Sequence, residues 1–392
     1  MENDSVTSGL GQAMIREPAY PAARTVAKTI EAHFARQVAE ARRRAEHELA
    51  PAPSADTIEA IIDATFWASL RPEEGRFPTI SIAFLPPEMG QPMLFERNLP
   101  LRPDVLTKLA PAVERPGIHL GVWGEADQLH VWGATRVIPS LGFVLENVEP
   151  GLLVIKHRRI DGLGKFANVA VLKGDQVKVI DERGTSLPDC PELLKALLAF
   201  SSSNETPEGV NVLVQLAASM RAHGRGGSLL VVPAGNGAWR DSVIHPITYS
   251  IEPPFSRLAD LLRQESSEIS ENLWEASVRR AVDSVAGLTA VDGATVINDR
   301  FEVLAFGVKI SLTAGSAPVA RMVVTEPIMG NRPNVVPPVQ HGGTRHLSAA
   351  QFVHDQRDAI ALVASQDGRF TVFAWSPCED MVHAHRVDVL LL

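Results

Sequence analysis

The spacing of apolar residues changes twice along this chain of 392 residues. From Ala22 to Leu49 apolar side chains recur about every four residues, which predicts a helix. A second helix is expected from Asp56, which would cap it. Between Pro78 and Ile180 the apolar residues alternate, or form short runs between tight turns. That pattern predicts a mainly antiparallel sheet, interrupted by one helix near 103–113.

A third pattern begins at Pro188, where helical segments alternate with apolar strands. The helix expected over 207–222, for example, precedes the buried-type strand 228–233. This alternation predicts an α/β domain whose mixed sheet carries helices on both faces. We therefore expect an N-terminal tail and helix over residues 1–54, an α+β, mainly antiparallel domain over 55–187, and an α/β domain over 188–392.

Composition argues against several classes of partner. The net charge is -9, whereas proteins that bind nucleic acid through its phosphates are usually basic, so we expect no nucleic acid. The chain has no apolar run long enough for a membrane helix and no signal-peptide pattern at its start, so we expect no membrane. Its two cysteines, Cys190 and Cys378, match no metal-ligand spacing, and we expect a cytoplasmic protein.

The glycine cluster Gly224–Gly227 invites comparison with a dinucleotide-binding loop, but the order of elements is wrong for one. In a Rossmann motif the glycines follow a strand and open a helix, whose first amides face the pyrophosphate. Here they follow an expected helix and precede an expected strand. The cluster is better interpreted as a helix C-cap and turn.

A first candidate site segment surrounds Asp292. An acid is followed by Gly293 and Ala294 at the start of an apolar strand. Small residues allow a flat ligand to approach the backbone. The carboxylate could hold a divalent cation or accept a proton from a hydroxyl group. The simpler alternative is an acid in a tight β-turn.

A second candidate segment is Gly342–Gln351, in which glycines lead through a hydroxyl, a guanidinium and an imidazole into a helix. The first amides of a helix and its positive dipole end attract anions. Arg345 would add a forked cation, and Thr344 a hydroxyl. The alternative is an ordinary capped helix in which Thr344 is the N-cap.

Together the two segments resemble the diadenylate cyclase domain, which joins two ATP molecules into cyclic di-AMP. That family carries Asp-Gly-Ala at a strand start and Gly-Thr-Arg-His-Arg before a helix. Asp292–Ala294 and Gly343–His346 match these motifs in the same order. The resemblance extends upstream to the strand Gly227–Val232 and downstream to Leu362–Asp367, so it covers about residues 190–380.

The resemblance implies a role for each matching residue. Asp292 would ligate Mg²⁺ or Mn²⁺ and help to deprotonate a 3′-hydroxyl, while Arg345 and His346 would complete the catalytic group. The nucleotide-binding residues would be Gly293, Ala294, Gly343, Thr344 and Arg345. The implied activity is a nucleotidyltransferase that condenses two ATP into cyclic di-AMP and releases pyrophosphate.

Two positions depart from the family pattern. Leu347 stands where the family has a second arginine, and Gln366 where it has a metal-binding glutamate. Asp367, one residue further, is the candidate substitute ligand. A lost cation and a lost carboxylate both affect triphosphate and metal binding. The second candidate function is therefore a catalytically inactive nucleotide-binding sensor.

The N-terminal half is similar to domains that precede such cyclase modules and act as sensors. Its basic segment Lys156–Phe166 could hold a small anionic effector, or could be a solvated hairpin loop. Because each ATP must attack the α-phosphate of the other, the resemblance also implies a homo-oligomer whose active sites face one another. The apolar stripe of the first helix, Ala22 to Leu49, could supply a second contact between subunits.

Overall fold

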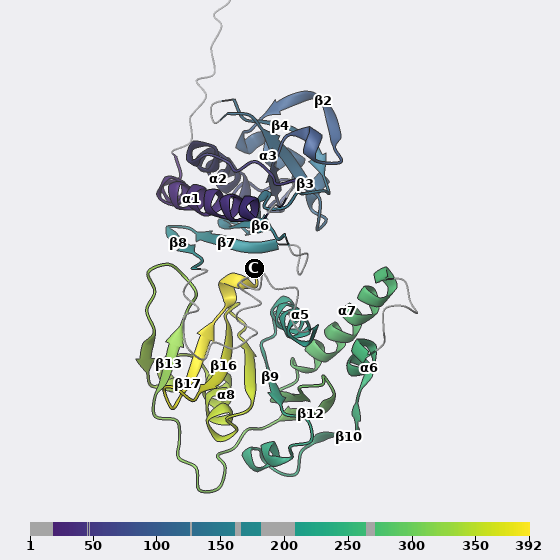
Figure 1. The fold of residues 1–392 in the computed structure, drawn as a ribbon, viewed down its shortest axis with the longest axis vertical. Coiled ribbons are helices and arrows are strands. Elements are labelled where there is room, and N and C mark those ends of the chain that lie inside the picture. Colours follow the sequence, from purple (N-terminus) through teal and green to yellow (C-terminus); the bar gives the residue numbers. More distant parts are fainter. Residues whose placement is uncertain are drawn as a thin grey trace, which may run out of the picture.

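The computed structural model describes residues 19–44, 46, 48–125, 128–160, 166–181, 208–263 and 271–392. These residues form two domains, each built on one large sheet with helices packed against it (Figure 1). This confirms the predicted fold class. The sequence also predicts a helix over 192–200, and this segment lies outside the described residues. So do Cys190 and residues 161–165 of the basic segment.

The N-terminal domain contains a sheet with the strand order β2-β4-β3-β1-β5-β6-β7-β8. Only the pair β1 and β3 is parallel, so the sheet is mainly antiparallel, as predicted. Its helices are α1 (Pro21–Arg43), α2 (Ala55–Ser69) and α3 (Pro103–Val113). Its strands are β1 (Ser81–Phe84), β2 (Met93–Pro100), β3 (His119–Trp123), β4 (His130–Thr135), β5 (Phe143–Glu149), β6 (Leu152–Arg158), β7 (Phe166–Lys173) and β8 (Gln176–Val179).

Helix α1 belongs to the core of this domain, although the sequence analysis sets residues 1–54 apart. Val26, Ile30 and Phe34 are buried in one apolar cluster with α2 and the sheet. The apolar stripe of α1 is therefore covered within the chain, and it needs no partner in another subunit. The N-cap of α2 is Ser54, whose hydroxyl accepts a hydrogen bond from the Thr57 N–H, rather than the predicted Asp56.

The C-terminal domain contains a mixed sheet with the strand order β10-β12-β11-β9-β15-β16-β17-β13-β14. Its helices are α5 (Glu208–Ala222), α6 (Arg257–Arg263), α7 (Glu271–Leu288) and α8 (Thr344–Asp355). A short 3-10 helix, η2 (Ala238–Ser242), follows β9, and another, η4 (Asp388–Leu390), follows β17. The strands are β9 (Gly227–Val232), β10 (Tyr249–Phe255), β11 (Ala294–Asn298), β12 (Val303–Val308), β13 (Met322–Thr325), β14 (Asn334–Val336), β15 (Ile360–Ala364), β16 (Phe370–Ser376) and β17 (Met381–Arg386).

Both faces of the second sheet are buried, which explains why its central strands are apolar throughout. On β9, Leu229 packs in the cluster that includes α5, α6 and α7, whereas Leu230 packs in the cluster that includes α8 and η2. Successive side chains of a strand point to opposite faces, so each face receives every second residue. The prediction of an α/β sheet with helices on both faces is confirmed.

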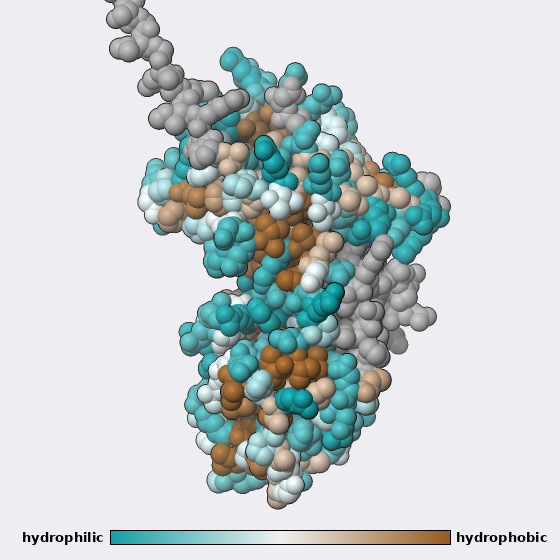
Figure 2. Space-filling model, turned by 90° about the vertical axis from the view of Figure 1, so that its left-hand side faces the viewer, coloured by the Kyte–Doolittle hydropathy of each residue, from teal (hydrophilic) through white to brown (hydrophobic). Residues whose placement is uncertain are grey.

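The two domains make contact through the last strands of the first sheet. The loop after β13 pairs with β8, because the Met329 N–H donates to the Val179 carbonyl at 2.8 Å and the Asp181 N–H to the Pro327 carbonyl at 3.0 Å. An ion pair of 2.6 Å joins Lys178 to Glu326. The C-terminus also lies between the domains (Figure 1), and the surface narrows at this level (Figure 2). Within the described part of the chain, no helix combines the length and the apolarity needed to cross a membrane.

Candidate functional site

Two stretches that are far apart in the sequence meet at the edge of the C-terminal sheet that is formed by the ends of its central strands. Strands β9 and β11 are parallel, with Ser228 beside Ala294, so both begin at this edge. Strand β15 runs the opposite way and ends there, with Ala364 beside Gly227. Strand β12 also ends there, with Val308 beside Ala294. The residues just before β11 and just after β12 and β15 therefore gather at one place.

Helix α8 starts at the same edge and supplies the second motif. Its N-cap is Gly343, in an extended backbone conformation. Gly343 has no side chain that could bond the first amides, so the N–H groups of Thr344 and Arg345 remain available to a ligand. The alternative in which Thr344 caps the helix is therefore wrong. The positive end of the helix dipole lies beside these two residues.

A cavity of about 560 Å³ lies between these segments. This is a usual size for a small-molecule site. The sequence analysis identified part of its lining: Asp292, Gly293, Ala294, Gly343, Thr344, Arg345 and His346. Four further lining residues, Ser228, Ser348, Ala364 and Ser365, lie in segments that the sequence analysis named without giving these residues a role. It missed the others: Ile244, Val308, Lys309 and Ile310. The structure thus brings the two motifs together around one cavity.

Lys309 is the missed residue with the clearest chemical consequence. Its Nζ lies 2.5 Å from Oδ2 of Asp292. The hydrogen bond from Lys309 lowers the pKa of Asp292, so this exposed carboxylate stays ionised at neutral pH. A permanently ionised carboxylate is better suited to binding a cation than to accepting a proton. The signal in the sequence is the hairpin β11–β12. Ala294 pairs with Val308 in this hairpin, so Lys309, the next residue, lies close to Asp292.

His346 is a buried and neutral side chain. It is only 6% exposed, and its Nε2 lies 3.4 Å from the Thr371 hydroxyl. Burial lowers the pKa of His346, so its ring adds no positive charge to the cavity at neutral pH. Gly342 allows the His346 ring to lie against the backbone, since a Cβ at position 342 would be only 2.7 Å from the Cγ atom of that ring. The geometry favours a role for His346 in positioning the start of α8.

Gly293 lies too close to the neighbouring strand β12 for a side chain to fit. Its φ is +114°, and a Cβ there would lie 2.5 Å from the carbonyl carbon of Gly307. The close approach of two backbones is therefore sufficient to explain this glycine, without a ligand. Ala294 is 2% exposed and contributes its side chain to the core beneath the cavity.

The residues where the family pattern breaks lie at the margin of the site. Asp367 does not line this cavity; it pairs with Arg369 at 3.3 Å and lines a different cavity, between the domains. The amide of Gln366 donates to the Arg225 carbonyl at 3.3 Å. Leu347 is 39% exposed, so an arginine at this position would not have to enter the core.

A divalent ion would find one carboxylate in the cavity, that of Asp292. No group of three His, Cys, Asp or Glu side chains suited to a metal occurs in the described ranges. Mg²⁺ is commonly bound through one or two carboxylates together with the phosphates of a substrate. Asp292 therefore fits an ion that arrives with a nucleotide, and the cavity does not fit an ion held by the protein alone.

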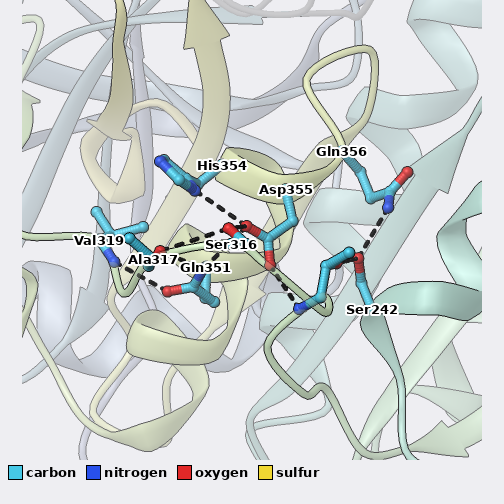
Figure 3. Close-up of polar contacts among 9 residues, drawn as sticks. Ser242, Ser316, Ala317, Val319, Gln351, His354, Asp355 and Gln356 are labelled. Atoms are coloured by element: carbon cyan, nitrogen blue, oxygen red, sulfur yellow. Dashed lines mark hydrogen bonds and ion pairs between the residues drawn. The ribbon is translucent and has the colours of Figure 1, made fainter.

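A hydrogen-bond network joins helix α8 to the segment that follows Ile310 (Figure 3). The Asp355 carboxylate, at the end of α8, accepts hydrogen bonds from the Ser316 hydroxyl at 2.5 Å and the Thr313 N–H at 3.1 Å. It also accepts from Gln351 and His354, each at 3.0 Å. Thr313 and Ser316 lie in the segment that follows Lys309 and Ile310. Asp355 thus fixes this segment relative to the helix that carries the second motif.

The basic segment Lys156–Phe166 is only partly described. The Lys156 ammonium is paired with Glu146 at 2.7 Å, and the His157 ring is buried, with its centroid 6.2 Å from that of Phe34. Two of the basic groups considered for an anionic effector are therefore engaged within the domain.

A known protein family matches part of the N-terminal domain. Residues 47–136 are similar to a family described as the probable sensor domain DACNV, the N-terminal sensor domain of diadenylate cyclase proteins. The matched region includes α2 and α3 and strands β1 to β4 of the N-terminal domain. A search of curated protein sequences finds no significant match. The N-terminal half of the chain therefore contains a region similar to a sensor domain of diadenylate cyclases.

Proposed function

We propose that this protein is a diadenylate cyclase, which condenses two ATP molecules into cyclic di-AMP with release of pyrophosphate under the control of its N-terminal domain. The observation that carries the proposal is the convergence of Asp292–Ala294 and Gly343–His346 on one cavity of about 560 Å³. The similarity of residues 47–136 to a cyclase sensor domain supports it independently, because that similarity lies in the other half of the chain.

The residues of the cavity have complementary tasks. The first amides of α8, the Thr344 hydroxyl and the Arg345 guanidinium would hold the triphosphate. A Mg²⁺ or Mn²⁺ ion brought by the nucleotide would neutralise developing negative charge. Asp292 would orient that ion and the attacking 3′-hydroxyl, and Lys309 would hold the Asp292 carboxylate in place. Two such cavities would have to face each other in a homo-oligomer, because one cavity holds one substrate.

A second candidate function is a nucleotide sensor without catalytic activity. Three observations favour it: Leu347 in place of a cation, Gln366 bonded to the backbone, and a lone carboxylate that already has a lysine partner. Such a protein would bind ATP through the same residues, and would lack the charges that stabilise the departing pyrophosphate.

The deciding experiment is to incubate the purified chain with ATP and Mn²⁺ and to measure cyclic di-AMP by mass spectrometry, with ATP binding measured by calorimetry in parallel. Product formation that disappears in Asp292→Asn would support the cyclase. ATP binding without product would favour the sensor. If the chain neither binds ATP nor forms product, both proposals are refuted.

A matched control is available in Asp241→Asn, which removes an equivalent charge from an exposed side chain of η2 that does not line the cavity. This variant should keep the ATP affinity and the activity of the parent. A loss of activity in both variants would point to a general effect of charge removal and would contradict the role given to Asp292.

A further inference from the structure

A second cavity lies between the two domains, and we call it the interdomain cavity. Its volume is about 180 Å³, which corresponds to about six water molecules and is much less than that of the candidate nucleotide site. One wall is apolar and consists of Leu152, Val171 and Val389, all of them buried. The rest is lined mainly by charged and polar groups: Glu149, Lys173, Gln176, Lys178, Arg221, Asp367, Arg369 and Asp388.

Several of these charges already have partners or lie in solvent. Lys178 is paired with Glu326 at 2.6 Å, and Arg369 with Asp367 at 3.3 Å. Glu149 and Lys173 are exposed. Two half-buried charges remain, those of Arg221 and Asp388, and neither forms an ion pair with any described residue.

Arg221 comes from the last turn of α5. Its guanidinium donates to two neutral acceptors, the Leu391 carbonyl at 3.1 Å and the Gly368 carbonyl at 3.4 Å. Burial lowers the pKa of Arg221, and Asp388 opposes that shift, so the two opposite charges act on each other across the cavity. A guanidinium has five N–H donors, so two such bonds leave capacity for an anionic ligand group.

Asp388 is in η4, and one oxygen of its carboxylate lacks a hydrogen-bond donor among the described residues. This atom, Oδ1, is buried. A buried carboxylate oxygen without a donor is costly, and such atoms usually bond to a ligand or to water. The cavity therefore presents an unfilled acceptor and a guanidinium with donors to spare, next to an apolar wall.

We propose that the interdomain cavity binds a small zwitterion of the α-amino acid class with an aliphatic side chain, with its carboxylate on Arg221 and its ammonium on Asp388. Each charge of such a ligand meets an opposite charge, and the apolar wall receives the side chain. The residues that touch it come from both domains, so binding stabilises one arrangement of the two domains over others.

The interdomain cavity is connected to the candidate site through the turn between β15 and β16. Asp367, Gly368 and Arg369 line the interdomain cavity, whereas Ala364 and Ser365 line the candidate site. The Gly368 N–H donates to the Ser365 carbonyl at 3.2 Å and the Ser365 N–H donates to the Arg369 carbonyl at 2.8 Å, so this turn bridges the two cavities. If the proposed function holds, a ligand in the interdomain cavity changes the nucleotide affinity through this turn, and this regulatory step rests on that function.

The test uses the full chain and calorimetry with each standard amino acid. We expect an aliphatic amino acid such as leucine to bind, and two half-ligands to bind at least about tenfold more weakly: isocaproate, which lacks the ammonium, and isopentylamine, which lacks the carboxylate. If no amino acid binds, or if a half-ligand binds as tightly as leucine, the proposal is overturned.

Variants separate the two charges. Asp388→Asn should weaken leucine binding at least about tenfold and leave isocaproate binding unchanged, whereas Arg221→Gln should weaken both. Lys108→Gln, which removes an exposed charge from α3, is the control and should change neither. Equal affinity for leucine in Asp388→Asn and the parent would refute the site. Leucine binding is measured without ATP, so the result tests the interdomain cavity even if the proposed nucleotide function fails.

Discussion

Replacing Asp355 with alanine should destabilise the C-terminal domain by at least about 3 kcal/mol. The Asp355 side chain is fully buried and accepts four hydrogen bonds (Figure 3). Two of the donors have alternatives: Gln351 also bonds the Ala317 carbonyl, and the His354 side chain is 28% exposed and can reach water. The other two, the Thr313 N–H and the Ser316 hydroxyl, lose a charged acceptor, which costs about 1.5 to 3 kcal/mol for each bond.

The same carboxylate predicts a pH dependence. Burial raises the pKa of Asp355, but the hydrogen bonds, led by that from Ser316, outweigh burial, and the net pKa is lower than usual. A group whose pKa is lower in the folded state adds stability above its unfolded pKa of about 3.9 and loses it as the pH falls through its folded pKa. The difference in stability between the parent and Asp355→Asn should therefore be greatest near neutral pH and shrink below about pH 4.

The assay is urea unfolding of the full chain, followed by tryptophan fluorescence. Trp375 packs against His354, with ring centroids 5.8 Å apart, and so reports on this part of the protein. In a domain of this size, about 3 kcal/mol corresponds to a fall of about 6 to 12 °C in Tm. Asp241→Ala should leave both quantities unchanged, since Asp241 is exposed. A loss below about 1 kcal/mol in Asp355→Ala would refute the account, because it would mean that water replaces the carboxylate.

Three further predictions concern the candidate site. Lys309→Met should weaken ATP binding more in EDTA than in Mg²⁺, because it removes a cation that metal can replace; equal weakening in both conditions would argue against the Asp292–Lys309 pair as the cause. Leu347→Arg should increase ATP affinity or product yield, because it adds a cation at an exposed position at the start of α8; a folded variant no better than the parent would place the triphosphate elsewhere. Specific activity at saturating ATP should rise with enzyme concentration and then level off if two cavities must meet; a flat response from a particle that light scattering shows to be monomeric would rule out that mechanism.

The elements that the sequence predicted best are those whose signals are local. The helix expected near 103–113 is observed as Pro103–Val113, and the strand expected over 228–233 is observed as Gly227–Val232. Strand β2 (Met93–Pro100) was missed because it lies at the edge of its sheet and is largely exposed, so its sequence has no apolar alternation. An edge strand is defined by its neighbour more than by its own side chains.

The parts of the candidate site that the sequence did not predict depend on strand pairing. Asp292 and Arg345 could be recognised from motifs that are continuous in the sequence. Lys309 joins Asp292 because β12 lies beside β11 in one register, and a shift by one residue would turn its side chain to the other face. Arg221 and Asp388 are 167 positions apart and become neighbours in one cavity because α5 and η4 pack together within the C-terminal domain.

The turn between β15 and β16 gives one physical explanation for the departures from the cyclase pattern. Gln366 stands where the family has a metal-binding glutamate, and in this chain its amide bonds the Arg225 carbonyl. The Arg345 guanidinium and the Gln366 side chain both approach Gly226, at 3.2 and 3.3 Å from the place of a Cβ. The turn therefore lies beside Arg345, the residue proposed to bind the triphosphate, and it also lines the interdomain cavity. On the proposed function, glutamine in place of the glutamate removes a metal ligand, and Asp292 is then the only carboxylate among the described residues of the cavity lining that can hold the ion. Weaker metal binding, and therefore slower turnover, is what this exchange would produce.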